Sequence, residues 1–159
     1  MKEIRKVIIL RGLQGSGKSY YAKQWINEDP EHRIRFNRDD IRNMLGKYWV
    51  PSREDFINDM YWNFLEQATT SGYDIIIDNM NLNEKYIKEV EDFVEETNSW
   101  LNQSPANFQY IVETKDFFNV PLQTCIDRDA QRENPIGADV IRMTYNKYKD
   151  RIIPWRYLN

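Results

Sequence analysis

The chain has 159 residues, with 25 acidic and 22 basic side chains and a formal net charge of −3, and 41% of its residues are hydrophobic. A domain of this length buries a sizeable core, and one cysteine with one histidine excludes a disulfide framework or a zinc site built from these side chains. The apolar run Val7–Leu10 is far shorter than a signal-peptide core or a membrane span, so the sequence predicts a soluble, cytoplasmic protein with no membrane partner.

Short apolar runs alternate with helix-period segments along the chain. The predicted strands are Lys6–Leu10, Arg33–Phe36, Tyr73–Ile77 and Phe108–Val112. The predicted helices are Lys18–Asn27, Asp39–Leu45, Arg53–Thr70, Asn83–Thr97, Val120–Arg132 and Ala138–Lys149, and residues 98–107 are expected to form a surface loop. This alternation predicts an α/β fold, with a parallel sheet of about four or five strands flanked by helices.

The first predicted strand runs into Gly12–Ser19, which fits G-x-x-x-x-G-K-[ST] and opens the first helix. Glycines let the backbone wrap a phosphate chain, and successive N–H groups with the helix N-terminus supply partial positive charge. In this motif Lys18 reaches the β and γ phosphates of a nucleotide, expected to be ATP, and the Ser19 hydroxyl ligates Mg²⁺. The predicted nucleotide contacts are Gly12, Gln14, Gly15, Ser16, Gly17, Lys18 and Ser19. The alternative is a glycine turn that only joins a strand to a helix.

The second predicted strand ends in Asn37-Arg38-Asp39-Asp40-Ile41-Arg42. If the loop binds ATP as a phosphate donor, the protein is a kinase and needs a group that orients and deprotonates the acceptor hydroxyl. That group should lie at the carboxyl end of a neighbouring strand. Asp39 stands there and Arg42 follows one helical turn later, so a carboxylate and a cation are offered together. The competing interpretation is that Asp39 or Asp40 only caps the helix.

The third predicted strand runs into Asp78-Asn79-Met80-Asn81-Leu82-Asn83. Asp78 occupies a Walker-B-like place, where a carboxylate holds a water on Mg²⁺ or orients the loop. A helix-capping turn explains Asn81 and Asn83 about as well. In the helix that follows, the acidic residues are expected to form a solvated face.

Arg128 and Arg132 are four residues apart, so in a helix spanning Val120–Arg132 they project from one face, just before an Asn-Pro break that would let the segment act as a lid. Planar guanidinium groups suit phosphoryl oxygens whose charge develops in the transition state. Ion pairs of Arg128 with Asp127 or Asp129 explain these residues equally well without that context.

Charge is unevenly distributed along the chain. Residues 1–53 carry 12 basic and 6 acidic side chains, residues 54–116 carry 3 and 14, and residues 117–159 carry 7 and 5. If the two basic ends meet in space, they form an anion site.

The order of these motifs, from the phosphate loop through NRDDIR and DNMNLN to the run from Asn119 to Met143, resembles the kinase module of the polynucleotide 5′-kinase family over roughly residues 4–148. The resemblance implies a P-loop kinase fold with a helical lid. It implies transfer of the γ-phosphate of ATP, with Mg²⁺, to the 5′-hydroxyl end of DNA or RNA in nucleic-acid end repair. The chain has no phosphatase signature and too few residues for a ligase, so residues 1–159 are expected to be a single kinase domain.

The resemblance also implies a role for each site residue. Lys18 and Ser19 would contact the ATP phosphates and Mg²⁺, Asp39 would be the general base, Arg42 would contact the neighbouring phosphate of the acceptor, and Arg132 with Arg128 would supply the lid arginines. Asp78 matches the family pattern loosely, because Met80 stands where threonine is common. The acidic middle segment is expected to face away from nucleic acid, so the acceptor would enter near Arg38, Arg42 and the lid.

Two other functions compete with this one. A kinase of a small molecule or nucleotide sugar, like the zeta-type toxins, would use the same Lys18, Ser19 and Asp39. A nucleotide-gated binding module would hydrolyse ATP slowly or not at all. NRDDIR favours an acceptor that carries a phosphate.

Two pairs of aromatic residues leave alternatives open. Tyr48 and Trp49 can stack on a terminal base, although core packing is the expected use. Trp155 and Tyr157 suit either the core or an interface.

Overall fold

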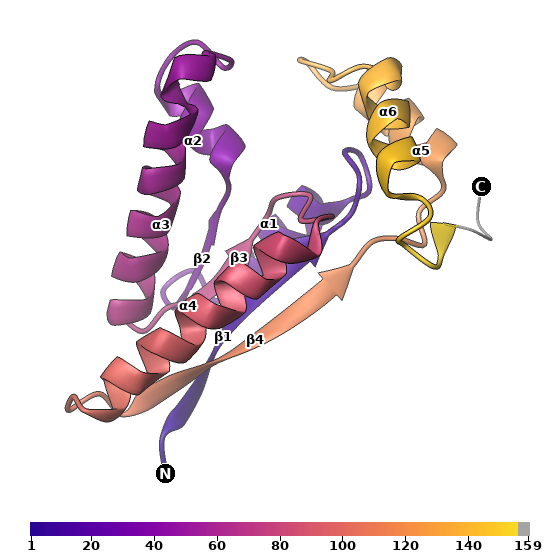
Figure 1. Cartoon of the computed structure of the whole chain (residues 1–159). Helices are drawn as coiled ribbons and strands as arrows, with labels where there is room; N and C mark the ends of the chain where they lie inside the picture. Colours follow the sequence, from indigo (N-terminus) through magenta and orange to yellow (C-terminus); the bar gives the residue numbers. More distant parts are fainter. Residues whose placement is uncertain (156–159) are drawn as a thin grey trace.

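Four parallel strands form one sheet in the order β2-β3-β1-β4 (Figure 1). They are β1 (Glu3–Arg11), β2 (Arg33–Phe36), β3 (Asp74–Ile77) and β4 (Phe108–Asp116). The structure, a computed structural model, describes residues 1–155. The predicted α/β fold with a parallel sheet is confirmed. The first and last strands along the chain, β1 and β4, are longer than predicted because they pair with each other along their whole length.

Each predicted helix is present, with small shifts at the ends. The helices are α1 (Lys18–Glu28), α2 (Arg38–Met44), α3 (Glu54–Thr70), α4 (Glu84–Asn102), α5 (Leu122–Ala130) and α6 (Ala138–Tyr148). A short 3₁₀ turn, Pro51–Arg53, precedes α3. No helix of residues 1–155 combines the length and the apolar character needed to cross a membrane.

Two predicted helix ends are wrong for local reasons. The predicted loop over residues 98–107 begins too early, because Leu101 is buried and continues the apolar stripe of α4 for one more turn. The helix predicted to reach Arg132 stops at Ala130. There the buried carboxylate of Asp129 accepts hydrogen bonds from the backbone N–H groups of Ile136 and Gly137, which turns the chain back.

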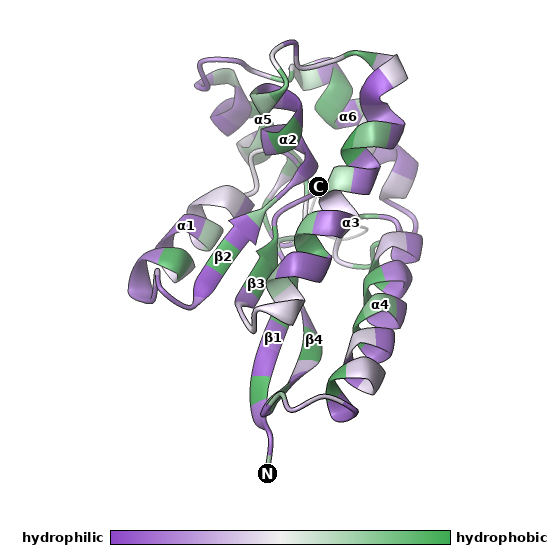
Figure 2. Cartoon of the chain, turned by 90° about the vertical axis from the view of Figure 1, so that its left-hand side faces the viewer, coloured by the Kyte–Doolittle hydropathy of each residue, from purple (hydrophilic) through white to green (hydrophobic). Residues whose placement is uncertain are grey.

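The sheet is covered on both faces. Side chains of β1 and β3 alternate, so that one set packs under α3 and α4 and the other under α1. The first set is Val7, Ile9, Ile75 and Ile77, and the second is Ile8, Leu10 and Ile76. Figure 2 shows the matching pattern on α4, where apolar and polar residues alternate around the helix.

A separate apolar cluster joins α5 and α6 to the carboxyl ends of the strands. Trp155 belongs to it, with its ring centroid 5.5 Å from that of Phe118 and 5.1 Å from that of Tyr145. Trp155 is therefore core, whereas Tyr157 lies outside the described residues. Figure 1 shows α2 with α3 on one side of the strand ends and α5 with α6 on the other, so the chain surrounds the edge of the sheet where the predicted site residues gather.

Candidate active site

The loop between β1 and α1 is tied together by its own lysine. The Lys18 ammonium donates to the carbonyl oxygens of Gly12 and Leu13, at 3.0 and 2.7 Å. Burial lowers the pKa of Lys18 to about 8, against the attraction of the Asp78 carboxylate, which raises it. A desolvated ammonium held by neutral carbonyls gains from an anion that enters the loop.

Two glycines give this loop its shape. Gly15 has φ of 77°, and a Cβ there would lie 2.3 Å from the carbonyl oxygen of Cys125 in α5. Gly17 has φ of 101° and precedes the first residue of α1. The side-chain oxygens of Gln14 and Ser16 are buried, and no hydrogen-bond partner for them occurs within residues 1–155. Buried polar atoms of this kind usually have a partner, which points to a ligand at the loop.

Both predicted lid arginines reach the phosphate loop. Arg128 places Nη1 3.4 Å from the Gly15 carbonyl oxygen, at the long end of the hydrogen-bond range. Arg128 and Arg132 line a cavity of about 170 Å³ together with Lys18 and Ser19. The prediction that the two arginines share one helix face is wrong, because Arg132 follows the end of α5.

The alternative, an ion pair of Arg128 with Asp127 or Asp129, is wrong, since no such pair forms within residues 1–155. The Asp127 carboxylate accepts a hydrogen bond from Gln123, and Asp129 accepts its two bonds from backbone N–H groups. Within residues 1–155, the one ion pair of this group joins Arg132 to Asp129 over 3.8 Å.

Asp39 stands at the start of α2, and the capping interpretation is wrong for it and for Asp40. The cap is Asn37, whose side-chain oxygen accepts from the Asp40 N–H at 2.7 Å. Oδ1 of Asp39 accepts instead from Nη1 of Arg42 at 2.6 Å and from the hydroxyl of Tyr48 at 2.9 Å. The carboxylate is therefore oriented by two side chains on the surface rather than used by the helix backbone.

Sequence reasoning missed the partner that holds Arg42. Glu54, in the first turn of α3, accepts from Nε and Nη2 of Arg42 at 2.9 and 2.8 Å. This two-point bond raises the pKa of Arg42, and the bond from Arg42 lowers the pKa of Glu54. No motif or helical spacing links the two positions, so the sequence carried no signal for the pair.

The expected core packing of Tyr48 and Trp49 is wrong. The two residues are 40% and 55% exposed and follow α2 on the surface. The guanidinium carbon of Arg42 lies 5.9 Å from the Tyr48 ring centroid and 5.8 Å from that of Trp49. The two rings therefore stand beside Arg42 and Asp39, in contact with solvent.

Arg38 is the second cation that α2 contributes, beside Arg42. Its guanidinium carbon lies 3.8 Å from the ring centroid of Tyr61 and 5.8 Å from that of Tyr86, and Nη2 donates to Asn58 at 3.2 Å. Tyr61 and Asn58 come from α3 and Tyr86 from α4. Their combined role around Arg38 was not readable from the sequence.

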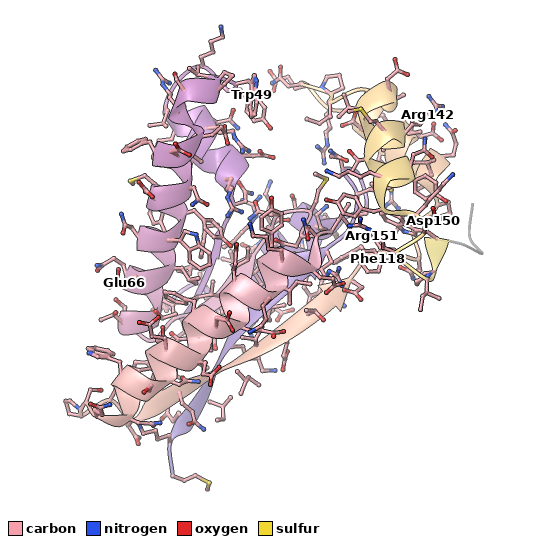
Figure 3. All side chains as sticks on the ribbon, in the orientation of Figure 1. Trp49, Glu66, Phe118, Arg142, Asp150 and Arg151 are labelled. Atoms are coloured by element: carbon pink, nitrogen blue, oxygen red, sulfur yellow. The ribbon has the colours of Figure 1, made fainter. Side chains whose placement is uncertain are left out.

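One cavity of about 520 Å³ lies between the predicted acceptor residues of α2, which form its acceptor side, and the segment that carries the predicted lid arginines, which forms its lid side. Arg38, Asp39 and Arg42 line it from α2, and Arg132 and Tyr148 line it from the segment that contains α5 and α6. Figure 3 shows the side chains that project between these two sides. The structure therefore brings the two basic ends of the chain together at this cavity, as the charge pattern predicts.

Asp78 lies beneath the phosphate loop, at the end of β3. Its side chain is 1% exposed, and Oδ2 accepts from Nε of Arg35 at 2.7 Å, while Arg35 also bonds Asp40. Oδ1 is buried and has no hydrogen-bond partner within residues 1–155. Its charge raises the pKa of Lys18, so the carboxylate acts on the same loop.

The oxygen donors at the loop fit Mg²⁺ bound through water and a nucleotide better than a closed protein site. Residues 1–155 hold no cluster of three or more His, Cys, Asp or Glu side chains able to bind a metal. Mg²⁺ characteristically keeps several waters and takes one or two protein oxygens with substrate phosphates. The free Oδ1 of Asp78 and the hydroxyl of Ser19 are oxygens of that kind.

The asparagines after β3 have separate uses. Asn83 caps α4, accepting from the Lys85 N–H at 3.1 Å, as the capping interpretation predicts. Asn81 is not a cap: it has φ of 49°, and its side chain donates to the carbonyl of Leu10. It therefore holds the β3 loop against the end of β1.

An aromatic cleft of about 460 Å³ adjoins the phosphate loop. Gly17 and Tyr20 line both this cleft and the cavity of the loop. The remaining walls are Tyr21, Gln24, Trp25, Glu28 and Phe117. No residue pattern in the sequence indicates such a cleft, because its walls come from α1 and from the end of β4.

The comparisons with known proteins agree with this fold. A curated protein of Autographa californica nuclear polyhedrosis virus, named "Putative bifunctional polynucleotide kinase/RNA ligase", is 24% identical over 162 residues, which cover 91% of this chain and 21% of that protein. A structure of the Pnkp1/Rnl/Hen1 RNA repair complex matches with a TM-score of 0.69 and 23% identity, over 96% of this chain and 47% of the other. A second structure of that complex matches with a TM-score of 0.58 and 25% identity, over 80% and 40%.

The chain therefore spans less than half the length of each of these proteins. The name of the viral protein includes a polynucleotide kinase, the family that the motif order resembles, and the two structural matches show that this chain shares their fold. A family model described as an AAA domain matches residues 7–154, from the first strand to the end of the cluster around α6. Because this match covers nearly the whole chain and includes the phosphate loop, the chain belongs to the AAA domain family.

Proposed function

We propose that this chain transfers the γ-phosphate of ATP to the 5′-hydroxyl end of a nucleic acid, in nucleic-acid end repair. One observation carries the proposal: Arg132 lines both the cavity of the phosphate loop and the cavity that contains Asp39. Phosphoryl transfer needs a donor phosphate and an acceptor oxygen in line, with cations around the transferred group. The arrangement supports such a reaction at the junction of the two cavities.

On the donor side, the phosphates of ATP would take the place of the Gly12 and Leu13 carbonyls as partners of Lys18. Backbone N–H groups of the loop and the start of α1 would hold the remaining phosphate oxygens. The Ser19 hydroxyl, with Asp78 through a water, would hold Mg²⁺, which neutralises charge on the β and γ phosphates when bound. The aromatic cleft beside Tyr20 would take the base of ATP.

On the acceptor side, Asp39 would orient the 5′-hydroxyl and take its proton. All the hydrogen bonds of this carboxylate to other described residues are made through Oδ1, which leaves Oδ2 for the acceptor. In a loose transition state the proton leaves late, so the position of Asp39 matters more than its basicity. Arg38 and Arg42 would attract the phosphate that follows the reacting nucleotide. Arg132 and Arg128 would stabilise the charge on the transferred group.

Transfer of labelled γ-phosphate from ATP to a 5′-hydroxyl oligonucleotide tests the proposal, with a panel of small-molecule alcohols run in parallel. Lys18→Ala should lose transfer while circular dichroism stays unchanged, because the side chain serves the loop and not the core. Asp39→Asn should lower transfer by about 10²-fold or more and keep ATP binding. Asp55→Asn, an exposed neighbour of Glu54 outside the cavity, is the matched control.

A small-molecule kinase is the second candidate, and one observation favours it. Glu54 already neutralises Arg42, the arginine that would otherwise recognise an acceptor phosphate. Under this alternative, a nucleoside and a nucleoside 3′-phosphate would be equal acceptors, and a small alcohol of the panel would outperform every oligonucleotide. A clear preference for the nucleoside 3′-phosphate would instead support the polynucleotide kinase.

A further inference from the structure

We propose that Arg35 is a positioning residue that couples the phosphate loop to the helix that carries Asp39. The inference rests on the proposed function, because phosphoryl transfer needs its donor and acceptor groups held in one fixed geometry. Arg35 lies in β2, before the helix cap Asn37, and no motif of the sequence includes it. Its guanidinium joins two carboxylates that belong to different sides of the site, Asp78 and Asp40.

Both contacts of Arg35 are short. Nε donates to Oδ2 of Asp78, and Nη1 donates to Oδ2 of Asp40, each over 2.7 Å. The side chains of Arg35 and Asp78 are 14% and 1% exposed, so salt screens this pair weakly. Asp40 is exposed, in the first turn of α2. The bridge therefore runs from the buried end of β3 to the start of α2, and charged hydrogen bonds of this length fix the orientation of both carboxylates.

On the donor side, Arg35 balances the charge of Asp78. Burial lowers the pKa of Lys18 and the charge of Asp78 raises it, so this carboxylate also acts on the phosphate loop. A buried carboxylate that loses its partner is strongly destabilised and attracts another cation. Without Arg35, Asp78 would hold Lys18 in competition with the nucleotide phosphates. Arg35 therefore keeps the lysine available to the nucleotide.

On the acceptor side, Arg35 ties α2 to the sheet. The carboxylate of Asp39 is oriented by Arg42 and Tyr48, which belong to α2 and to the segment that follows it. Those two bonds set the carboxylate relative to its own segment. The bond from Arg35 to Asp40, the next residue, instead sets the start of α2 relative to β2 and β3. A small shift of the helix would move Asp39 away from the transferred phosphate, and such shifts are costly for the rate.

Other contacts hold α2 in place when Arg35 is replaced. The backbone N–H of Arg38 donates to the side-chain oxygen of Asn79 over 3.1 Å, and Ile41 is buried in the apolar cluster under α3 and α4. Neither contact involves Arg35. Loss of the bridge should therefore let α2 shift slightly without releasing it from the sheet.

Arg5 in β1 is a matched control for Arg35. Its guanidinium also makes two contacts, from Nε to the carbonyl oxygen of Gly72 over 3.0 Å and from Nη2 to Glu3 over 2.7 Å. β1 reaches the phosphate loop only after Arg11, so Arg5 lies at the opposite end of the strand. Loss of Arg5 reports what a partly buried arginine contributes to stability alone.

Isothermal titration of ADP without Mg²⁺ tests the donor side of the bridge. Arg35→Ala should bind ADP about tenfold more weakly, because Asp78 then competes for Lys18. Adding Asp78→Asn to this variant should restore the affinity. Arg35→Lys, whose ammonium can still pair with the buried Asp78, should bind ADP like the wild type, and so should Arg5→Ala. An unchanged affinity in Arg35→Ala, or a loss that Asp78→Asn does not restore, would overturn the inference.

The rate of transfer to a 5′-hydroxyl oligonucleotide tests the acceptor side. Arg35→Lys and Asp40→Ala should each lower kcat about tenfold and leave KM for ATP unchanged, because each breaks the bridge at Asp40 alone. A merely structural role would lower the melting temperature, as in Arg5→Ala, without this split between kcat and KM. A wild-type kcat in both variants would overturn the inference.

Hydrogen exchange separates the inference from the proposed function, because it needs no acceptor. Binding of ADP should slow exchange in α2 of the wild type, and not in Arg35→Lys or Asp40→Ala. This coupling, in a protein that transfers no phosphate to any acceptor, would support the bridge and contradict the proposed kinase. Exchange in α2 of the wild type that is indifferent to ADP, beside normal transfer, would overturn the bridge and leave the kinase standing.

Discussion

The two sides of the central cavity are built differently. On the acceptor side, Arg42 is 15% exposed in its side chain and donates three hydrogen bonds, two to Glu54 and one to Asp39. On the lid side, the side chain of Arg132 is 45% exposed. Within residues 1–155 it forms one ion pair, with Asp129 at 3.8 Å. Asp39, the proposed acceptor carboxylate, is thus oriented before a substrate binds, whereas Arg132, the proposed lid arginine, has only this long contact of its side chain within residues 1–155.

Because of this difference, substitutions on the two sides should lower activity by different amounts. A side chain with fixed partners mainly orients those partners, so its removal also disturbs them. A side chain without strong partners is available to the charge that develops in the reaction, and its loss falls on the rate. We therefore expect the largest effects from the lid side and the phosphate loop, and smaller effects from the residues that hold the acceptor side.

Arg132→Ala should lower kcat about 10³-fold, the effect of removing an arginine from the transferred phosphate in related chemistry. Thermal stability should be unchanged, because within residues 1–155 the side chain makes only one long contact. Single-turnover transfer from labelled ATP measures the effect, and Arg142→Ala, an exposed arginine of α6, is the control. A loss of less than tenfold would show that Arg132 does not touch the transferred group.

Nucleotide binding at the phosphate loop should depend on pH through Lys18. The pKa of Lys18 is about 8 in the free protein, and a bound polyphosphate favours the charged amine and raises that pKa. Below pH 8 the lysine is already protonated, so the affinity for ADP should not change with pH. Above pH 8 binding must take up a proton, so affinity for ADP should fall by up to tenfold per pH unit.

Isothermal titration of ADP between pH 7 and 9.5 measures this dependence, and buffers with different ionisation enthalpies report the proton uptake directly. Lys18→Arg keeps a charged side chain throughout this range, so its affinity should not fall. A flat profile in the wild type would mean that the ammonium keeps its charge in the free loop.

The residues proposed for the donor half of the site can be named from the sequence, because the information there is local. The glycines, Lys18 and Ser19 have fixed spacing, and the strand and helix on either side are needed by the same motif. The strands were predictable for a similar reason: runs such as Ile75-Ile76-Ile77 are buried on both faces and need no partner to be recognised. The role proposed for Asp39 likewise follows from its place at a strand end.

The acceptor half depends on contacts between elements, which the sequence does not encode at any fixed spacing. Glu54 meets Arg42 only because α3 packs against α2, and Tyr86 meets Arg38 only because α4 covers the same face of the sheet. The surface position of Trp49 was likewise missed, since an indole ring is more often buried than left to a ligand. Tertiary packing decided each of these three cases.

The lid backbone offers a smaller test. Asp129→Asn keeps the size of the side chain but replaces one acceptor oxygen with an N–H₂ group, which faces the N–H groups of Ile136 and Gly137. The loop that carries Arg132 should loosen, and kcat should fall about tenfold, well below the loss in Arg132→Ala. Hydrogen exchange at residues 136 and 137 should speed up, which separates positioning from chemistry. Asp127→Asn, on the same helix with Gln123 as its partner, should change neither readout.

The smallest expected effect concerns Glu54, and it tests whether the fixed partner of Arg42 limits acceptor binding. Glu54→Gln removes the charge and one of the two acceptor oxygens, so Arg42 becomes more available to a phosphate. The preference for a nucleoside 3′-phosphate over the plain nucleoside should rise about threefold to tenfold in kcat/KM at low salt, and it should shrink as salt is added. At the same time kcat should fall slightly, because Arg42 orients Asp39 less firmly.

Asp55→Asn removes the same charge one residue away and should leave the preference unchanged, so it corrects for the general change in potential. If Glu54→Gln raises the preference and Asp55→Asn does not, Glu54 competes with the acceptor phosphate for Arg42. If the preference stays constant while kcat falls, Glu54 only positions the arginine. In that case the acceptor phosphate is recognised by Arg38, which keeps its guanidinium over the rings of Tyr61 and Tyr86 and within the cavity.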